Sequence, residues 1–147
     1  LMRDFTLDPR LEKDSTFVIA LELCDVRLHH NAAFPWILLV PRREDICEII
    51  ELTPLDRHLL MEEIVVASKV MRQLFQPTKL NTANLGNIVP QLHIHIVARY
   101  DHDKAWPAPI WNSGINLSYD STPKIERIAH LKDGFCTLKS HLMTKGA

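Results

Sequence analysis

The chain has 147 residues, the usual length of one domain, and we expect a single domain over residues 1–147. Its 17 basic and 18 acidic residues nearly cancel, so no overall positive charge attracts nucleic acid or an anionic membrane. With only 4 glycines, a glycine-rich phosphate loop is nearly excluded. No apolar run approaches the ~20 residues of a membrane span, and three cysteines without a CxxC spacing indicate a reducing compartment. The cytoplasm is therefore the expected location.

Apolar runs in the first third of the chain predict strands at 17–23, 26–30 and 37–40, the last ended by Pro41. A long helix is predicted to follow. Thr53 is placed to cap it, Pro54 suits its first turn, and Asp56 occupies the position of a capping-box acid. An apolar stripe at helical spacing then continues until Pro77, formed by Leu60, Ile64, Ala67, Met71 and Leu74.

After this helix, the pattern predicts a strand at 79–84, a Gly-Asn turn at 86–87 and a strand at 91–99. A second helix is expected over 124–132, ending near Gly134, and a short third one over 137–143. Strands, one long helix and further strands predict an α+β fold with a mainly antiparallel sheet.

The most informative segment is residues 91–97, in which polar and apolar side chains alternate strictly. Alternation places Gln91, His93 and His95 on one face of the strand, and Leu92, Ile94 and Ile96 on the other. Such a polar row suits the lining of a cleft. The two histidines could be a nucleophile and its partner, two metal ligands or structural residues, and spacing alone leaves all three open.

The sequence around this strand resembles the histidine triad (HIT) superfamily, whose signature is His-φ-His-φ-His-φ-φ, where φ is hydrophobic. Gly86 and Asn87 match the Gly-Gln or Gly-Asn pair that precedes the motif, which places Gln91, His93 and His95 at its three polar positions. Residues 31–42 resemble the family's Asn or Asp, turn and strand ending in Pro-Arg or Pro-Lys. Together with the Pro-Trp pair and the loop at 105–107, the pattern is similar to a bacterial HIT hydrolase branch.

This resemblance implies a HIT-like fold, with a five-stranded sheet, one long helix and a C-terminal helix. It also implies nucleotide hydrolysis or nucleotidyl transfer, by cleavage of a phosphoric anhydride or a phosphoramide, on substrates of the diadenosine polyphosphate or adenylate type. His93 would attack the α-phosphate and form a covalent nucleotidyl-histidine, with a backbone carbonyl orienting its other ring nitrogen. His95 would hydrogen-bond the phosphate or bridging oxygen, and Gln91 would complete the catalytic set. Imidazole suits this role because it is mostly neutral at pH 7.

The resemblance also implies a set of substrate-binding residues. Asn87 would donate to a phosphate oxygen, Asn31 would bind the ribose hydroxyls, and Trp36 would line the pocket. Strand residues near Leu28 and Ile37 would line the pocket for the base. No metal or other cofactor is required by this chemistry, although the family's nucleotide substrates often carry Mg²⁺. A homodimer is expected, because many HIT proteins form one, with neither nucleic acid nor membrane as a partner.

Two departures from the family pattern keep a second hypothesis open. Gln91 stands where the first triad histidine is expected, and Trp36 stands where many members have a histidine. Glutamine cannot carry a proton charge, so the chain could bind nucleotides with little turnover. A third hypothesis is a metal-dependent hydrolase, in which Asp101 or His102 completes a site with the histidine pair.

Overall fold

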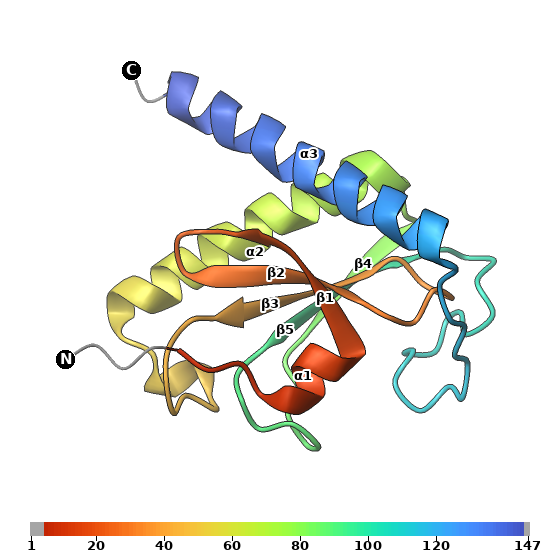
Figure 1. Cartoon of the computed structure of the whole chain (residues 1–147), viewed down its shortest axis with the longest axis horizontal. Coiled ribbons are helices and arrows are strands. Elements are labelled where there is room, and N and C mark those ends of the chain that lie inside the picture. Colours follow the sequence, from red (N-terminus) through yellow and green to blue (C-terminus); the bar gives the residue numbers. More distant parts are fainter. Residues whose placement is uncertain (1–4, 146–147) are drawn as a thin grey trace.

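The computed structural model describes the backbone of residues 5–145 and the side chains of residues 5–138. In chain order its elements are α1 (Pro9–Asp14), β1 (Ser15–Ala20), β2 (Cys24–His29), β3 (Trp36–Pro41), the 3-10 helix η1 (Ile49–Glu51), α2 (Pro54–Phe75), β4 (Lys79–Ala83), β5 (Ile94–Arg99) and α3 (Ser121–Lys145). Helices α2 and α3 cover one face of the sheet, while α1 and long loops lie on the other side (Figure 1).

The five strands form one sheet in the order β1-β2-β3-β5-β4, and every neighbouring pair is antiparallel. This confirms the predicted α+β fold. The strand bounds differ by a few residues from those expected, most usefully at β5, which begins at Ile94 and not at Gln91. The reason is that the backbone N–H of Leu92 donates to the carbonyl of Ile46, 2.9 Å away, and not to a neighbouring strand.

The face beneath α2 and α3 carries the larger apolar cluster. Leu92, Ile94 and Ile96 belong to it, as the alternation predicted. Leu28 and Ile37 also belong to it, and both are completely buried. Alternation turns these two side chains away from the face that carries His95, so only their neighbours along the strands, such as His29 and Leu38, face the histidine pair.

A second apolar cluster lies on the opposite face of the sheet. Trp36 and Val97 pack there with Leu11 of α1 and with Ile110 of the loop that follows β5. The N-terminal segment (residues 5–14) and this loop thus cover the sheet face that the two long helices leave open. Gln91 contacts the N-terminal segment and His95 contacts Trp111 of the loop, so the polar face of residues 91–97 lies between these two segments.

The long helix α2 begins and ends with ordinary caps. The hydroxyl oxygen of Thr53 accepts from the N–H of Asp56 at 3.1 Å, and Gln76 ends the helix in the left-handed conformation, with φ of 47°. The capping-box role expected for Asp56 is wrong, because its carboxylate accepts from Arg43 at 2.6 and 3.0 Å. The apolar stripe is confirmed at its buried members Leu60, Ala67 and Met71.

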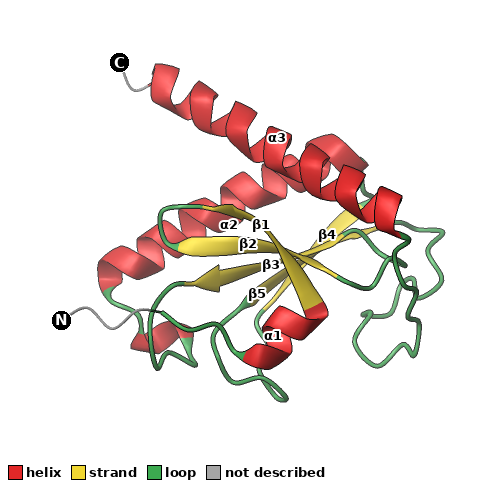
Figure 2. Ribbon diagram, viewed as in Figure 1, coloured by secondary structure: helices red, strands yellow, loops and turns green. Residues whose placement is uncertain are grey.

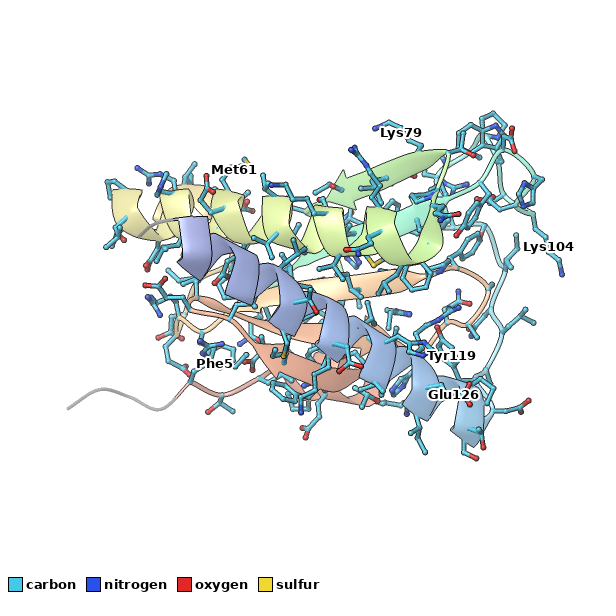
Figure 3. The ribbon with its side chains drawn as sticks, turned by 90° about the horizontal axis from the view of Figure 1, so that it is seen from above. Phe5, Met61, Lys79, Lys104, Tyr119 and Glu126 are labelled. Carbon is cyan, nitrogen blue, oxygen red and sulfur yellow. The ribbon has the colours of Figure 1, made fainter. Side chains whose placement is uncertain are left out.

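The C-terminal region forms one continuous helix, α3, so the expectation of two helices separated near Gly134 is wrong (Figure 2). Gly134 lies inside α3, where an added Cβ would come within 3.0 Å of Val70 on α2. Glycine costs a helix only about 1 kcal/mol, and here it permits the close approach of α3 to α2. The two helices cross in Figure 1 and lie side by side in Figure 3. Among the described residues, no helix combines the length and apolarity needed to cross a membrane.

Candidate active site

The two histidines predicted to share a face do so, on the side of the sheet opposite α2 and α3. His93 directly precedes β5 and His95 lies within it, paired with Leu38 of β3. The centroids of the two imidazole rings are 4.9 Å apart and their planes are inclined at 68°. Trp36, at the start of β3, pairs with Val97 and lies on the same face.

The tautomer of His93 is fixed by a backbone carbonyl. Its Nδ1 lies 2.7 Å from the carbonyl oxygen of Gln91. Because a carbonyl oxygen can only accept a hydrogen bond, Nδ1 must carry the proton and donate it. The neutral ring therefore keeps its lone pair on Nε2. This is the orienting carbonyl that the family resemblance implied.

His95 is held in the opposite tautomer by Trp36. The indole Nε1–H of Trp36 donates to Nδ1 of His95 at 3.0 Å, and indole nitrogen is a donor only. The neutral ring of His95 therefore carries its proton on Nε2. Burial lowers the pKa of His95 to about 3, with further contributions from His93 and His29. His95 is thus a neutral hydrogen-bond donor at physiological pH.

Both free Nε2 atoms reach solvent although their residues are largely buried. His93 is 5% exposed and His95 is 7% exposed. Within the part of the chain that the structure describes, however, the only fully buried side-chain nitrogen or oxygen without a hydrogen-bond partner is Nε1 of Trp111. The site therefore presents one ring nitrogen with a lone pair beside one ring N–H. Such a pair can attack an electrophile and hydrogen-bond the oxygens around it.

Two further aromatic residues complete the cluster. From the sequence, His29 is compatible with a place beside the pocket because it lies near Asn31, and Trp111 with a loop over the site, but neither has a defined role there. His29, at the end of β2, stacks on Trp36 with ring centroids 3.6 Å apart and an angle of 3° between planes. Trp111 meets the rings of His95 and Trp36 edge-on, at 5.3 and 6.1 Å. Burial lowers the pKa of His29 to about 4, and its Nδ1 accepts from the N–H of Asn31 at 3.0 Å.

The side chain of Gln91 does not hydrogen-bond to either histidine. Its Oε1 accepts from the N–H of Asp8 at 2.8 Å, and its Nε2 donates to the carbonyl of Thr6 at 2.9 Å. The residue at the first triad position therefore joins the N-terminal segment to the strand approach, while its own carbonyl orients His93. A catalytic role for the Gln91 side chain stays a prediction.

The two asparagines expected to bind substrate differ in their surroundings. The Oδ1 of Asn31 accepts from Ala33 and Leu117, and its Nδ2 donates to Ile115, so its amide mainly fixes loops. Asn87 is exposed in the turn after Gly86, whose φ of 102° suits glycine. Its side chain has no partner among the described residues, so it is available to a ligand.

The residues expected to complete a metal site lie elsewhere. Asp101 and His102 follow the far end of β5, and the seven residues from His93 to Arg99 alone span about 20 Å. Both are exposed and contact each other at 3.2 Å. Across the described residues, no group of three or more His, Cys, Asp or Glu side chains is placed to hold a metal ion. The metal site predicted from the histidine pair with Asp101 or His102 is therefore not formed among the described residues.

Comparison with known proteins fits this geometry. The model of the HIT domain family matches residues 10–102. The structure of histidine triad protein blr8122 from Bradyrhizobium japonicum is 40% identical, with a TM-score of 0.88 over 90% of this chain and 99% of that one. A histidine triad protein from Marinobacter aquaeolei is 38% identical, with a TM-score of 0.88 over 92% of this chain and 99% of that one.

A more distant likeness is to ST2152 from Sulfolobus tokodaii, a hypothetical histidine triad nucleotide-binding protein. It is 15% identical, with a TM-score of 0.68 over 88% of this chain and 89% of that one, which shows the fold alone. No curated protein matches the sequence. The fold and the paired histidines define a histidine triad protein, and the chain belongs to the HIT domain family. That family includes nucleotide hydrolases and transferases.

Proposed function

We propose that this protein is a nucleotide hydrolase or nucleotidyl transferase that acts at the α-phosphate of a nucleotide conjugate, of the diadenosine polyphosphate or adenylate type. The observation that carries the proposal is the 2.7 Å hydrogen bond from Nδ1 of His93 to the carbonyl of Gln91. It leaves the lone pair of His93 on Nε2, which reaches solvent beside the N–H of His95. A neutral imidazole with a directed lone pair is an effective nucleophile.

The reaction then proceeds in two displacements at phosphorus. In the first, Nε2 of His93 forms a bond to the α-phosphorus. The bond from phosphorus to the leaving group breaks, and the leaving group departs with the electron pair. In the second, a water oxygen attacks phosphorus, the P–N bond breaks, and the electron pair returns to Nε2 while the water proton passes to solvent. In transfer, another acceptor replaces water. The Nε2–H of His95 stabilises charge on the phosphoryl or bridging oxygen.

The surrounding residues supply substrate contacts. Asn87 has an exposed amide without an internal partner, which suits donation to a phosphate oxygen. Trp36 walls the pocket beside His95. Asn31 keeps one amide hydrogen for the ribose beyond the one it gives to Ile115. The chemistry itself requires no metal, and Mg²⁺ would enter with the nucleotide. The protein would act as a homodimer in the cytoplasm.

A second candidate is nucleotide binding with little turnover. The observation that favours it is that the amide of Gln91 is occupied by Thr6 and Asp8. The first triad position therefore has no free group to relay a proton. This candidate predicts that adenosine monophosphate binds in calorimetry while no diadenosine or adenylate compound is turned over.

Intact-protein mass spectrometry under denaturing conditions tests the proposal. After brief mixing with diadenosine tetraphosphate or an aminoacyl adenylate analogue, we expect a nucleotidyl adduct on the protein. His93→Ala should lose the adduct and reduce turnover by roughly a thousandfold or more. His58→Ala, on the exposed side of α2, is the matched control and should behave as the native chain. Full turnover in His93→Ala would overturn the proposal.

A further inference from the structure

We propose that Trp36 makes this site selective for leaving groups that depart as oxygen anions, such as phosphates and carboxylates, over leaving groups that depart as amines. The inference rests on the proposed function, because it concerns the leaving group that His93 displaces. It narrows the substrate class to anhydrides of a nucleotide with a phosphate or a carboxylic acid. Trp36 acts in this as a positioning residue, through its hydrogen bond to His95.

The position of the indole proton of Trp36 determines whether His95 can carry a charge. The Nε1–H of Trp36 points at Nδ1 of His95 from 3.0 Å. An imidazolium carries protons on both nitrogens, so a charged His95 would set an N–H against the indole N–H. Donor against donor at this distance is repulsive. As long as Trp36 stays in place, His95 is therefore held neutral.

The packing of Trp36 prevents its indole N–H from turning away from His95. Its ring is stacked on His29 at 3.6 Å, contacts Trp111 edge-on, and is 7% exposed. Moving it would break a packed cluster on the sheet. His29 gives no alternative source of protons, because its Nδ1 already accepts from the N–H of Asn31. Burial also lowers the pKa of both His29 and His95, in agreement with the geometry.

In the described part of the chain, no other acidic group lies beside His93 and His95 to supply a proton. Among the described residues, no Asp or Glu forms a hydrogen bond or ion pair with His93 or His95. Asp8 lies near enough for a charge on His93 to influence it, but hydrogen bonds from Arg10 hold the pKa of Asp8 below its usual value. The site therefore provides hydrogen-bond donors without a group that readily releases a proton.

The chemical consequence depends on the bond that breaks. When a P–O bond to a phosphate or an acyl group breaks, the electron pair goes to an oxygen that is stable as an anion, so no proton is needed. When a P–N bond breaks, the pair goes to nitrogen, and an amine must gain a proton as it leaves. Neutral imidazole is far too weak an acid to supply it. Phosphoramidates should therefore react much more slowly than anhydrides.

The test compares two adenylyl donors, diadenosine tetraphosphate and adenosine 5′-phosphoramidate, on the full-length protein. We expect kcat/KM to favour the anhydride by about a hundredfold or more, the usual contribution of a general acid. Trp36→Phe keeps an aromatic ring but removes the N–H, and it should reduce this ratio about tenfold, most of all near pH 5.5. Trp106→Phe is the matched control, because Trp106 contacts Arg99 and lies outside the ring cluster around His95, and the ratio should not change.

Two measurements separate the possible failures. If neither donor gives an adduct at His93, the proposed function itself is wrong. If adducts form but the native protein cleaves the phosphoramidate as fast as the anhydride, or Trp36→Phe leaves the ratio unchanged, only this inference is overturned. The ¹⁵N spectrum of His95 provides a readout without turnover. We expect the Nε2–H tautomer in the native protein at pH 5.5. In Trp36→Phe, Nδ1 loses its donor and the ring should gain its second proton at a higher pH than in the native protein, although burial still lowers the pKa of His95.

Discussion

At the scale of single residues, Gln91 makes two kinds of contact, of which the family resemblance implied only the backbone carbonyl at His93. Its carbonyl orients His93, and its side chain binds Thr6 and Asp8 of the N-terminal segment. We expect Gln91→His, which completes a formal triad, to lower nucleotide turnover and not to raise it. The imidazole ring is shorter and does not reproduce the two amide contacts. Loss of one or both of these hydrogen bonds should lower the unfolding free energy by about 1–2 kcal/mol, which urea denaturation measures.

Asp8 offers a matched control for this prediction. Its φ of −57° suits proline. Asp8→Pro therefore removes two groups, the Asp8 side chain and the backbone N–H that donates to Oε1 of Gln91. Asp8→Ala removes the side chain alone. Turnover should be lower in Asp8→Pro than in Asp8→Ala, and combining Asp8→Pro with Gln91→Ala should add little. Faster turnover in Gln91→His than in the native chain would contradict this account.

At the scale of elements, α2 is joined to the β1–β2 turn by a buried carboxylate. Glu63 is 7% exposed, and its two oxygens accept from the N–H groups of Leu23 at 2.7 Å and Cys24 at 3.0 Å. Glu63→Ala would leave both N–H groups without a partner. Because such buried donors are costly, we expect the unfolding free energy to fall by about 3 kcal/mol in urea denaturation.

The neighbouring residue is the control for this change. Glu62 lies on the exposed side of the same helix, so Glu62→Ala should change stability by less than about 0.5 kcal/mol. Equal stability of the two variants would show that Glu63 does not join α2 to the sheet.

The elements that could be predicted from the sequence are those with a strong periodic signal. The stripe and cap of α2 and the alternation in β5 belong to this group. The prediction of two helices at the C-terminus is wrong because glycine often ends a helix, whereas here the packing of Gly134 against Val70 outweighs its helix penalty. The six residues of α1 were missed, because so short a helix depends on the Asp8 cap and on contacts with the sheet.

At the scale of the whole molecule, the site combines segments that local patterns cannot bring together. The histidine pair follows from alternation within one strand. The contacts of Trp36 with His29, His95 and Trp111 require the strand order β2-β3-β5 and the placement of a distant loop. Strand order is a property of the complete sheet, so His29 and Trp111 could not be assigned to the site from spacing. The hydrogen bond from Trp36 that sets the tautomer of His95 likewise depends on the pairing of β3 with β5.

The buried histidines make the stability of the whole molecule depend on pH. Burial lowers the pKa of His29 to about 4 and of His95 to about 3, below their ordinary value near 6.5 in the unfolded chain. As pH falls below 6.5, the unfolded chain binds these protons and the folded chain does not, so the unfolding free energy must decrease. The slope should reach up to about 1.4 kcal/mol per pH unit for each histidine.

Urea denaturation at pH 7.5, 6.5, 5.5 and 4.5 measures this dependence. The hydrogen bonds from Arg99 lower the pKa of Asp103 to about 2. Asp103 therefore loses its stabilising effect mainly below this pH range. His29→Phe keeps a ring stacked on Trp36 but removes one titrating group, so its slope should be smaller by the contribution of one proton. A stability that stays constant from pH 7.5 to 4.5 would mean that His29 and His95 take up protons in the folded protein. Trp36 would then not hold His95 neutral, and the selectivity for anionic leaving groups would lose its physical basis.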